Sequence, residues 1–371
     1  MLYRKMTTVI ENQLQSQAGS ILVVDGVPGT GRRTLVRNAG QKLFKHYIEI
    51  NFKEDKQTKR NLFSGIGKTD AFYQALETYY KKPLSLRNDT LVVFEEIETY
   101  PKIVNLLKNL VKENRFTYVI IGTGLRQSET LPKDLLRFVT IRPMDFTEYL
   151  MANGIQKSTL ETMYENFRLC LSLNEEMHAR VLQMFNDYLF VGGMPGVVDA
   201  FLKNKDIDEV RRQQHDVREF YGRNMNRDGV HAPIVFDMIY PLHSEENTET
   251  KLYFNDVGMM TSVMEFSDFR EPDYEDITFA TFINTEAVSH GVQLYNYRDS
   301  DILLFNDKNT NTVVPLIPDC SYADAAQMLE VVKTIDNIQN IYVLSTQREI
   351  HKEGNVTYIP VYDVMFLLRN C

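Results

Sequence analysis

A short glycine-bearing segment near the start of the chain most constrains its fold. Residues 20–24 form an apolar, β-branched run of the kind found in buried parallel strands. Glycines follow at positions 26, 29 and 31, and apolar residues then recur at helical spacing over residues 33–44. The segment therefore predicts a strand, a tight turn and a helix in direct succession, as in α/β proteins.

The glycine spacing is that of a phosphate-binding loop. Gly26 and Gly31 occupy the two glycine positions of the pattern G-x-x-x-x-G-K-[ST]. Such a loop points backbone N–H groups at a phosphate, and the helix N-terminus adds the positive end of its dipole. A plain glycine-rich turn is the alternative, but the strand before and the helix after favour the phosphate loop. The expected nucleotide-binding residues are Gly26, Gly29, Thr30, Gly31, Arg32, Arg33 and Thr34.

Two arginines replace the residues that normally complete this loop. Arg32 stands at the lysine position and keeps the charge, but its guanidinium is a planar fork rather than a compact ammonium. Arg33 stands at the Ser/Thr position and has no oxygen to offer Mg²⁺. The hydroxyl of Thr34 comes one residue later, about 100° further round the helix. We therefore expect ATP or ADP as the cofactor, regard Mg²⁺ as doubtful, and rank nucleotide binding above hydrolysis.

A second motif, residues 91–96, is an apolar strand that ends in two carboxylates. In P-loop enzymes the first of two such acids lies near the metal ion and the next near the attacking water. Glu95, a methylene longer than the usual aspartate, is the expected metal residue, and Glu96 is the expected catalytic base. The alternative is that the two acids mark the N-terminus of a helix from Ile97 onward.

Further candidates follow the next apolar run. Thr123, within residues 121–124, is placed to contact the γ-phosphate or hold the attacking water. Arg126 and Arg137 are candidates for a charge-stabilising arginine finger. The expected catalytic set is Glu96, Thr123 and Arg137.

Strands and helices alternate over the first 145 residues, which predicts a parallel sheet covered by helices on both faces. The expected strands are residues 20–24, 47–52, 90–94, 116–121 and 138–141, and the expected helices are residues 33–44, 70–80 and 101–111.

The rest of the chain changes pattern twice. Helical spacing runs throughout residues 146–227 and predicts a helical lid. Residues 228–250 are polar and irregular, and residues 251–371 mix short strands with one or two helices, as in a small α+β domain. The expected domains are 1–145 (P-loop core), 146–227 (lid), 228–250 (linker) and 251–371 (α+β domain).

The composition of the chain disfavours several classes of binding partner and location. The formal charge of −9 disfavours nucleic-acid binding, because no basic stripe offsets it. The three cysteines lie far apart, so neither a disulfide framework nor a cysteine zinc site is expected, which fits a reducing cytoplasm. We find neither a signal peptide nor an apolar run long enough to span a membrane. A cytoplasmic location away from membranes is the expectation.

The order of these motifs resembles that of bacterial and archaeal AAA-type ATPases that carry a C-terminal restriction-endonuclease-like domain. The resemblance covers nearly the whole chain. Its anchors are residues 26–35, 91–101, 118–124, 142–150, 191–195, 251–258 and 358–362. It implies an AAA core, a helical lid, usually a winged helix, and a nuclease-like tail.

This sequence departs from the family pattern beyond the phosphate loop. Only 23 residues separate the segments matching 221–227 and 251–258, too few for a winged helix, so the usual DNA-contacting module is missing. The tail's metal site falls on Ala280, Asp301, Ile317 and Asp319, of which only Asp301 keeps its expected form. Metal-dependent phosphodiester cleavage is therefore not expected.

Three hypotheses follow. The first is an AAA-type ATP-binding protein with impaired hydrolysis, in which nucleotide controls the arrangement of core and lid. The second is an active ATPase with an atypical phosphate loop, and the third is an interaction scaffold that binds no nucleotide. An unknown protein partner and an oligomer are compatible with all three, whereas DNA binding by this chain alone is not expected.

Overall fold

The computed structural model describes residues 2–16, 19–52, 68–81, 83–84, 89–97, 102–128, 131–225, 236–241, 250–264, 272–297, 302–307, 312–317 and 322–370. The chain divides into two compact units. One comprises Arg4–Arg142, and the other comprises Pro143–Cys371 with Met1–Tyr3.

The first unit is built on a five-stranded sheet in the order β2-β3-β4-β1-β5. All its strand pairs are parallel, which confirms the expected parallel α/β core. The central strands are apolar and buried because helices cover both faces. The strands are β1 (Ile21–Gly26), β2 (His46–Asn51), β3 (Thr90–Glu95), β4 (Thr117–Ile121) and β5 (Leu136–Ile141).

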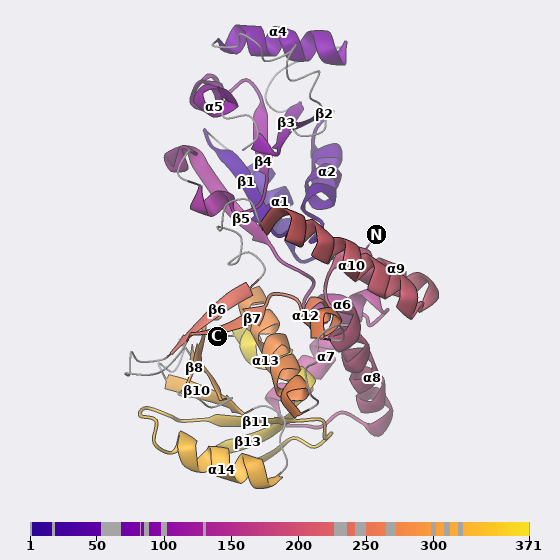
Figure 1. Ribbon diagram of the computed structural model, residues 1–371, viewed down its shortest axis with the longest axis vertical. Helices are drawn as coiled ribbons and strands as arrows, with labels where there is room; N and C mark the ends of the chain where they lie inside the picture. The colour runs from indigo at the N-terminus through magenta and orange to yellow at the C-terminus, as the bar shows by residue number, and fades with distance from the viewer. Residues whose placement is uncertain are drawn as a thin grey trace. The chain divides into compact units, whose positions relative to one another are not determined.

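Two pairs of helices sandwich this sheet (Figure 1). On one face α1 (Met6–Gln15) and α2 (Arg32–Leu43) pack on β1, β3 and β4. On the other face α4 (Thr69–Tyr80) and α5 (Lys102–Glu113) bury a cluster of aromatic and aliphatic side chains. Helix α1 was not predicted from the sequence. Because parallel strands end at the same edge, the carboxyl ends of β1, β3 and β4 bring their following residues together.

The second unit begins with helices that share a core with a later helix. Phe146 of the first helix packs edge-on against Phe185 and Phe282, whose ring centroids are 5.6 Å and 6.0 Å away. This shared core places the helices of residues 146–225 in one compact unit with the C-terminal part. These helices are α6 (Phe146–Ala152), α7 (Lys157–Arg168), α8 (Glu175–Val191), α9 (Pro195–Asn204) and α10 (Ile207–Met225).

The second unit also contains an eight-stranded mixed sheet in the order β12-β13-β11-β10-β9-β8-β6-β7. Its strands are β6 (Phe236–Pro241), β7 (Lys251–Phe254), β8 (Leu294–Asn296), β9 (Leu303–Asp307), β10 (Thr312–Ile317), β11 (Ile341–Ser345), β12 (His351–Glu353) and β13 (Val356–Pro360). The remaining α-helices described in the second unit are α12 (Val257–Met264), α13 (Pro272–Ser289), α14 (Tyr322–Val332) and α15 (Val364–Leu367).

Two features of the second unit differ from expectation. Strand β6 lies within residues 228–250, which looked irregular, and it pairs with both β7 and β8. Helix α13 was also missed, because its buried face includes polar residues such as Thr281, Asn284 and Glu286. Such a helix has no apolar stripe to recognise.

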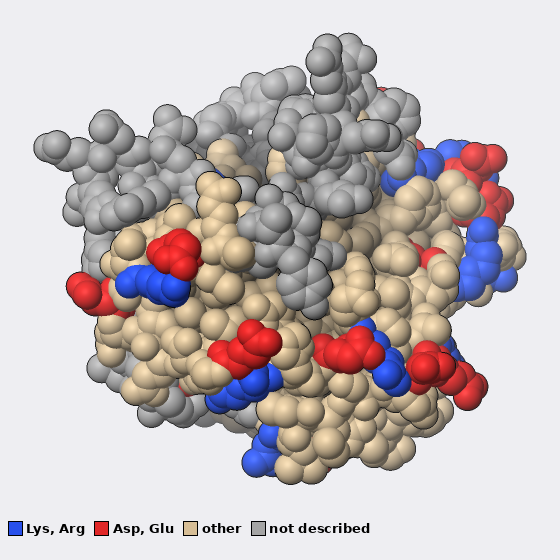
Figure 2. Space-filling view, turned by 90° about the horizontal axis from the view of Figure 1, so that it is seen from below, with Lys and Arg blue, Asp and Glu red and all other residues tan. Residues whose placement is uncertain are grey.

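The described surface shows no gathering of basic side chains on the face seen in Figure 2, where acidic and basic groups lie beside one another. Among the described residues, some acidic and basic side chains form ion pairs one helical turn apart, such as Lys333 with Glu330 and Arg168 with Glu165. Among the described residues, the helices are either too short or too polar to cross a bilayer.

Candidate functional site: the glycine loop after β1

The loop between β1 and α2 depends on glycine at its first position. Gly26 has a φ of 144°, and an added Cβ would lie 2.2 Å from the carbonyl oxygen of Ile141 on β5. The last glycine, Gly31, has a left-handed φ of 84° and caps α2. The amide of Leu35 donates to the Gly31 carbonyl at 3.0 Å, as expected in the first helical turn. The amides before Leu35 point out of the helix toward the loop, which is the geometry of an anion site.

A buried arginine braces the loop from the N-terminal segment. The guanidinium of Arg4 donates to the carbonyls of Thr30 (2.8 Å) and Arg142 (2.7 Å), so it ties the loop to the segment after β5. The Thr30 hydroxyl is fully buried and donates to the carbonyl of Val27 at 2.8 Å. This hydroxyl therefore shapes the loop, and Thr30 would meet a phosphate through its amide.

A buried aspartate braces the loop from within the sheet. Asp25, the residue before Gly26, accepts the Gly26 amide on one carboxylate oxygen at 2.8 Å. Its other oxygen accepts the amide of Arg126 at 3.1 Å. Asp25 thus holds the start of the loop to the segment that follows β4.

Arg32, at the lysine position of the loop pattern, turns toward that segment. One of its terminal nitrogens donates to the Gly122 carbonyl and lies 3.0 Å from the hydroxyl oxygen of Thr123. The structure therefore brings together Arg32, the cation expected to bind phosphate, and Thr123, the residue expected to contact the γ-phosphate. A γ-phosphate between them would accept from the Arg32 guanidinium, so that both partners of the hydrogen bond would be ionised.

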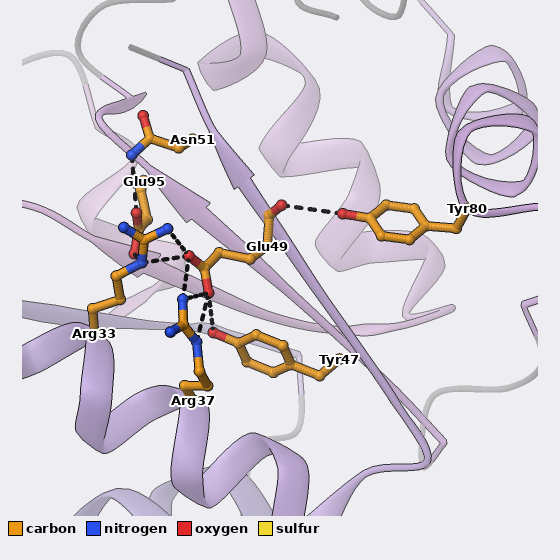
Figure 3. A network of polar contacts seen from close by, with 7 residues as sticks. All are labelled: Arg33, Arg37, Tyr47, Glu49, Asn51, Tyr80 and Glu95. Atoms are coloured by element: carbon orange, nitrogen blue, oxygen red, sulfur yellow. Dashed lines mark hydrogen bonds and ion pairs between the residues drawn. The ribbon is translucent and has the colours of Figure 1, made fainter. Parts of the chain in front are cut away.

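Arg33, at the Ser/Thr position, joins two carboxylates (Figure 3). Its guanidinium bonds to Glu49, on β2, and its Nε atom lies 3.3 Å from the Oε1 atom of Glu95 at the end of β3. Glu95 is buried, and its second oxygen accepts from the side-chain amide of Asn51 at 3.1 Å. The acid expected to serve a metal ion is thus engaged by two side chains of this chain.

Glu49 is the centre of this network. Its carboxylate also accepts two hydrogen bonds at 2.9 Å from Arg37, one turn further along α2, and one at 2.8 Å from the Tyr47 hydroxyl. Burial alone would raise the pKa of the Glu49 carboxyl, but the bonds from Arg37, Tyr47 and Arg33 outweigh it and lower the pKa. Burial and the Glu49 carboxylate raise the pKa of the Tyr47 hydroxyl. Glu49 therefore stays ionised and holds both guanidinium groups in place.

The remaining expected catalytic residues are placed differently from one another. Glu96 follows Glu95 directly and has a left-handed φ of 54°, which is uncommon for a residue with a side chain. Arg137 aligns with Leu22 on β1, four residues before Gly26, so its backbone lies about 13 Å from the loop along the strand. The guanidinium carbon of Arg126 lies 5.1 Å from the centre of the Phe138 ring. The register thus places Glu96 at the carboxyl ends of the strands, where the loop lies, and leaves Arg137 near their amino ends.

Sequence reasoning missed the residues that support the loop. Glu49 and Tyr47 alternate with the buried Ile48 and Ile50 along β2, and this alternation was a usable signal for a half-buried carboxylate. Arg37 lies four residues after Arg33, a spacing that places both on one helical face. No comparable signal marks Arg4, whose two acceptors are distant in sequence.

The parallel sheet, the glycine loop before α2 and the acids at the end of β3 define the class of this unit: a P-loop ATPase core. In agreement, residues 18–150 match the model of a protein family described as an AAA domain. Residues 18–150 therefore form an AAA-type domain.

Comparison with solved structures gave distant similarities. A Walker-type ATPase of Pyrococcus abyssi is 13% identical with a TM-score of 0.34, and the match covers 100% of this chain and 96% of that one. AMPPCP-bound DnaA from Aquifex aeolicus is 12% identical with a TM-score of 0.35, covering 61% and 71% of the two chains. A STAND protein with a tetratricopeptide repeat sensor from Pyrococcus horikoshii is 14% identical with a TM-score of 0.34, covering 78% and 45%. No curated protein matches the sequence.

Proposed function

We propose that this chain is an AAA-type protein that binds ATP or ADP, hydrolyses ATP poorly, and uses bound nucleotide to control the arrangement of its core and its helical lid, residues 146–227. The observation that carries the binding part is the shape of the loop. Gly31 caps α2 in a left-handed conformation, and Arg4 and Asp25 brace the loop on either side. A loop held in this shape needs little reorganisation to receive phosphates.

The impaired hydrolysis follows from the side chains around the loop. Phosphoryl transfer in P-loop enzymes relies on positioning and on charge stabilisation at the transferred group. Arg33 brings charge but no metal-binding oxygen, and Glu95 is engaged by Arg33 and Asn51. Among the residues that the structure describes at this strand end, Glu96 is the acid that remains to orient an attacking water. Glu95, the first acid of the usual pair, is therefore occupied by protein contacts and does not serve catalysis.

The C-terminal part is proposed to serve as a restriction-endonuclease-like scaffold without nuclease activity, and a protein rather than DNA is proposed as its partner. Two of the four positions that the family's metal site would use carry apolar side chains: Ala280 is buried on α13 and Ile317 is buried at the end of β10. The other two, Asp301 and Asp319, lie outside the described residues. A location in the cytoplasm is part of the same proposal.

Calorimetric titration of the full chain with ATP and with ADP tests the binding. We expect saturable binding of both nucleotides and a marked loss of affinity in Arg32→Ala and Gly31→Asp. Lys42→Ala is a matched control, because Lys42 is an exposed cation on the same helix that pairs with Glu11. Unchanged affinity in both loop variants would show that the nucleotide binds elsewhere.

The same preparation separates the alternatives. No detectable binding would favour the scaffold without nucleotide, and rapid magnesium-dependent hydrolysis that is lost in Glu96→Gln would favour an active ATPase. Small-angle scattering with and without ATP tests the arrangement of core and lid. The proposal expects the scattering profile to change on ATP addition in the wild type and to stay the same in Gly31→Asp.

A further inference from the structure

The fold family implies a magnesium ion at this loop, and the residues present do not fit one. A P-loop ion is normally held by the hydroxyl at the position of Arg33 and by the acid at the position of Glu95. Here the first of these carries a guanidinium, and that guanidinium is ion-paired with the second. Among the described residues, no group of three or more His, Cys, Asp or Glu side chains could hold a metal ion.

From this disagreement we infer that the site binds nucleotide without a divalent cation, and that the Arg33 guanidinium takes the place of the magnesium ion. The inference rests on the proposed nucleotide binding and adds to it the chemical form of the ligand. The ligand is a nucleoside di- or triphosphate without a bound divalent cation.

The position of Arg33 supports the substitution. Its Cα lies in the first turn of α2, next to the loop, and its Nε atom lies 3.3 Å from the Glu95 carboxylate, which would otherwise face a metal ion. Glu95 is buried, and a buried carboxylate needs a cationic or hydrogen-bonding partner. Arg33 supplies a cationic partner in the absence of nucleotide, whereas a metal ion would arrive only with nucleotide.

A second carboxylate fixes Arg33 in that position. Glu49 accepts hydrogen bonds from both Arg33 and Arg37, so the Arg33 side chain is held at its far end. The hydrogen bonds from Arg37, Tyr47 and Arg33 keep this carboxylate ionised against the effect of its partial burial. For Mg²⁺ to reach Glu95, the Arg33 guanidinium would have to leave both carboxylates.

The charged residues around the loop also disfavour a magnesium ion. The guanidinium groups of Arg32, Arg33 and Arg37 on α2 are matched in number by the carboxylates of Glu49, Glu95 and Glu96. A metal-free phosphate chain meets Arg32 and Arg33 as its counter-charges. A magnesium complex brings a divalent cation toward Arg33, and like charges at such close range repel. The metal-free form should therefore bind at least as tightly as the magnesium complex.

The test is a fluorescence titration of the full chain with a fluorescent ATP analogue, once in EDTA and once in excess magnesium chloride. The wild type is expected to bind equally well or more tightly in EDTA. The variant Arg33→Thr restores a hydroxyl and frees Glu95, and magnesium should then tighten its binding by about tenfold, or about 1.4 kcal/mol. Arg37→Thr is the matched control, because Arg37 shares the Glu49 partner and lies one turn further from the loop. It should keep the metal preference of the wild type.

Each outcome has one meaning. Wild-type binding that requires magnesium overturns this inference and leaves the proposed nucleotide binding intact. Binding that is absent in both buffers contradicts the proposed function itself. If the wild type binds without metal and a folded Arg33→Thr shows the same indifference, the role assigned to Arg33 is wrong. The wild-type comparison is decisive even if Arg33→Thr does not fold.

Discussion

Arg33 and Glu95 form an ion pair, 3.3 Å from Nε to Oε1, between the first turn of α2 and the end of β3. The two residues belong to the two motifs that bind nucleotide and metal in P-loop proteins. Their direct contact means that the replacement in the loop and the acid at the strand end are one structural feature. Repairing either residue alone should therefore leave hydrolysis impaired.

This coupling predicts how hydrolysis can be restored. The double substitution Arg33→Thr with Glu95→Asp removes the ion pair and recreates a hydroxyl and a short carboxylate beside the loop. We expect magnesium-dependent phosphate release to rise above that of the wild type and of either single variant, because bound Mg²⁺ commonly supplies several kcal/mol to phosphoryl transfer. The gain should vanish when Glu96→Gln is added. A gain that persists in Glu96→Gln would exclude Glu96 as the base.

The first glycine of the loop should be intolerant of any side chain. Gly26→Ala places a methyl group 2.2 Å from the Ile141 carbonyl oxygen at a φ of 144°, so we expect destabilisation of about 2 kcal/mol or more. Gly19→Ala separates the two causes, since Gly19 also has a positive φ of 67° but nothing lies within 4 Å of its added Cβ. Denaturant unfolding of both variants measures the difference. Equal destabilisation would show that the contact with β5 is unimportant.

The contact by which Arg4 holds the glycine loop should require a guanidinium group. Arg4 donates through two separate nitrogens to the Thr30 and Arg142 carbonyls, and a lysine has a single nitrogen to offer. Arg4→Lys and Arg4→Ala should both lower the unfolding free energy, by roughly 1.5–3 kcal/mol for each charged hydrogen bond lost. Nucleotide affinity should fall with it, because the Thr30 carbonyl, and with it this part of the loop, is then no longer held. Full rescue of stability and affinity by lysine would contradict this role.

A buried carboxylate in the second unit should make stability depend on pH. Asp256 accepts the amides of Gly193 (2.6 Å) and Met259 (2.8 Å), and burial raises its pKa to about 6 despite these bonds. Since the folded state then holds the proton more tightly, this stabilising contribution is present below about pH 4 and is lost as pH rises through about 6. The difference in pKa corresponds to about 3 kcal/mol.

Asp256→Asn isolates this contribution because it cannot ionise. Unfolding by urea between about pH 4 and pH 7 should show the wild type losing stability relative to the variant as pH rises. Asparagine offers one acceptor oxygen instead of two, so the variant should also be less stable than the wild type at low pH. Parallel curves across this range would show that Asp256 does not titrate there.

The sequence was sufficient for elements whose pattern is local. The apolar runs at β1, β3 and β4 and the spacing of Gly26 and Gly31 predicted the parallel core and its loop. Helix α1 was not predicted, although Met6, Ile10 and Leu14 recur at helical spacing, because most of the residues between them are polar.

Other features depend on partners that are distant in the chain. Nothing local in the sequence indicates that Arg33 meets both Glu49 and Glu95, because that contact requires β2 and β3 to be neighbours in the sheet. In the same way, α13 is stabilised through buried polar groups such as Glu286, which accepts the amide of Phe146 at 2.7 Å. A hydrophobic pattern records burial of apolar groups and misses such contacts.

The central claim is that the loop after β1 holds the phosphates of a nucleotide without a metal ion. A crystal structure of the full chain grown with ATP in the presence of magnesium tests it most directly. We expect phosphate density against the amides of Gly29–Arg33, with the Arg33 guanidinium still paired to Glu95 and no metal ion between them. Nucleotide density at another part of the molecule, or a magnesium ion coordinated by Glu95 with Arg33 displaced, would contradict the account.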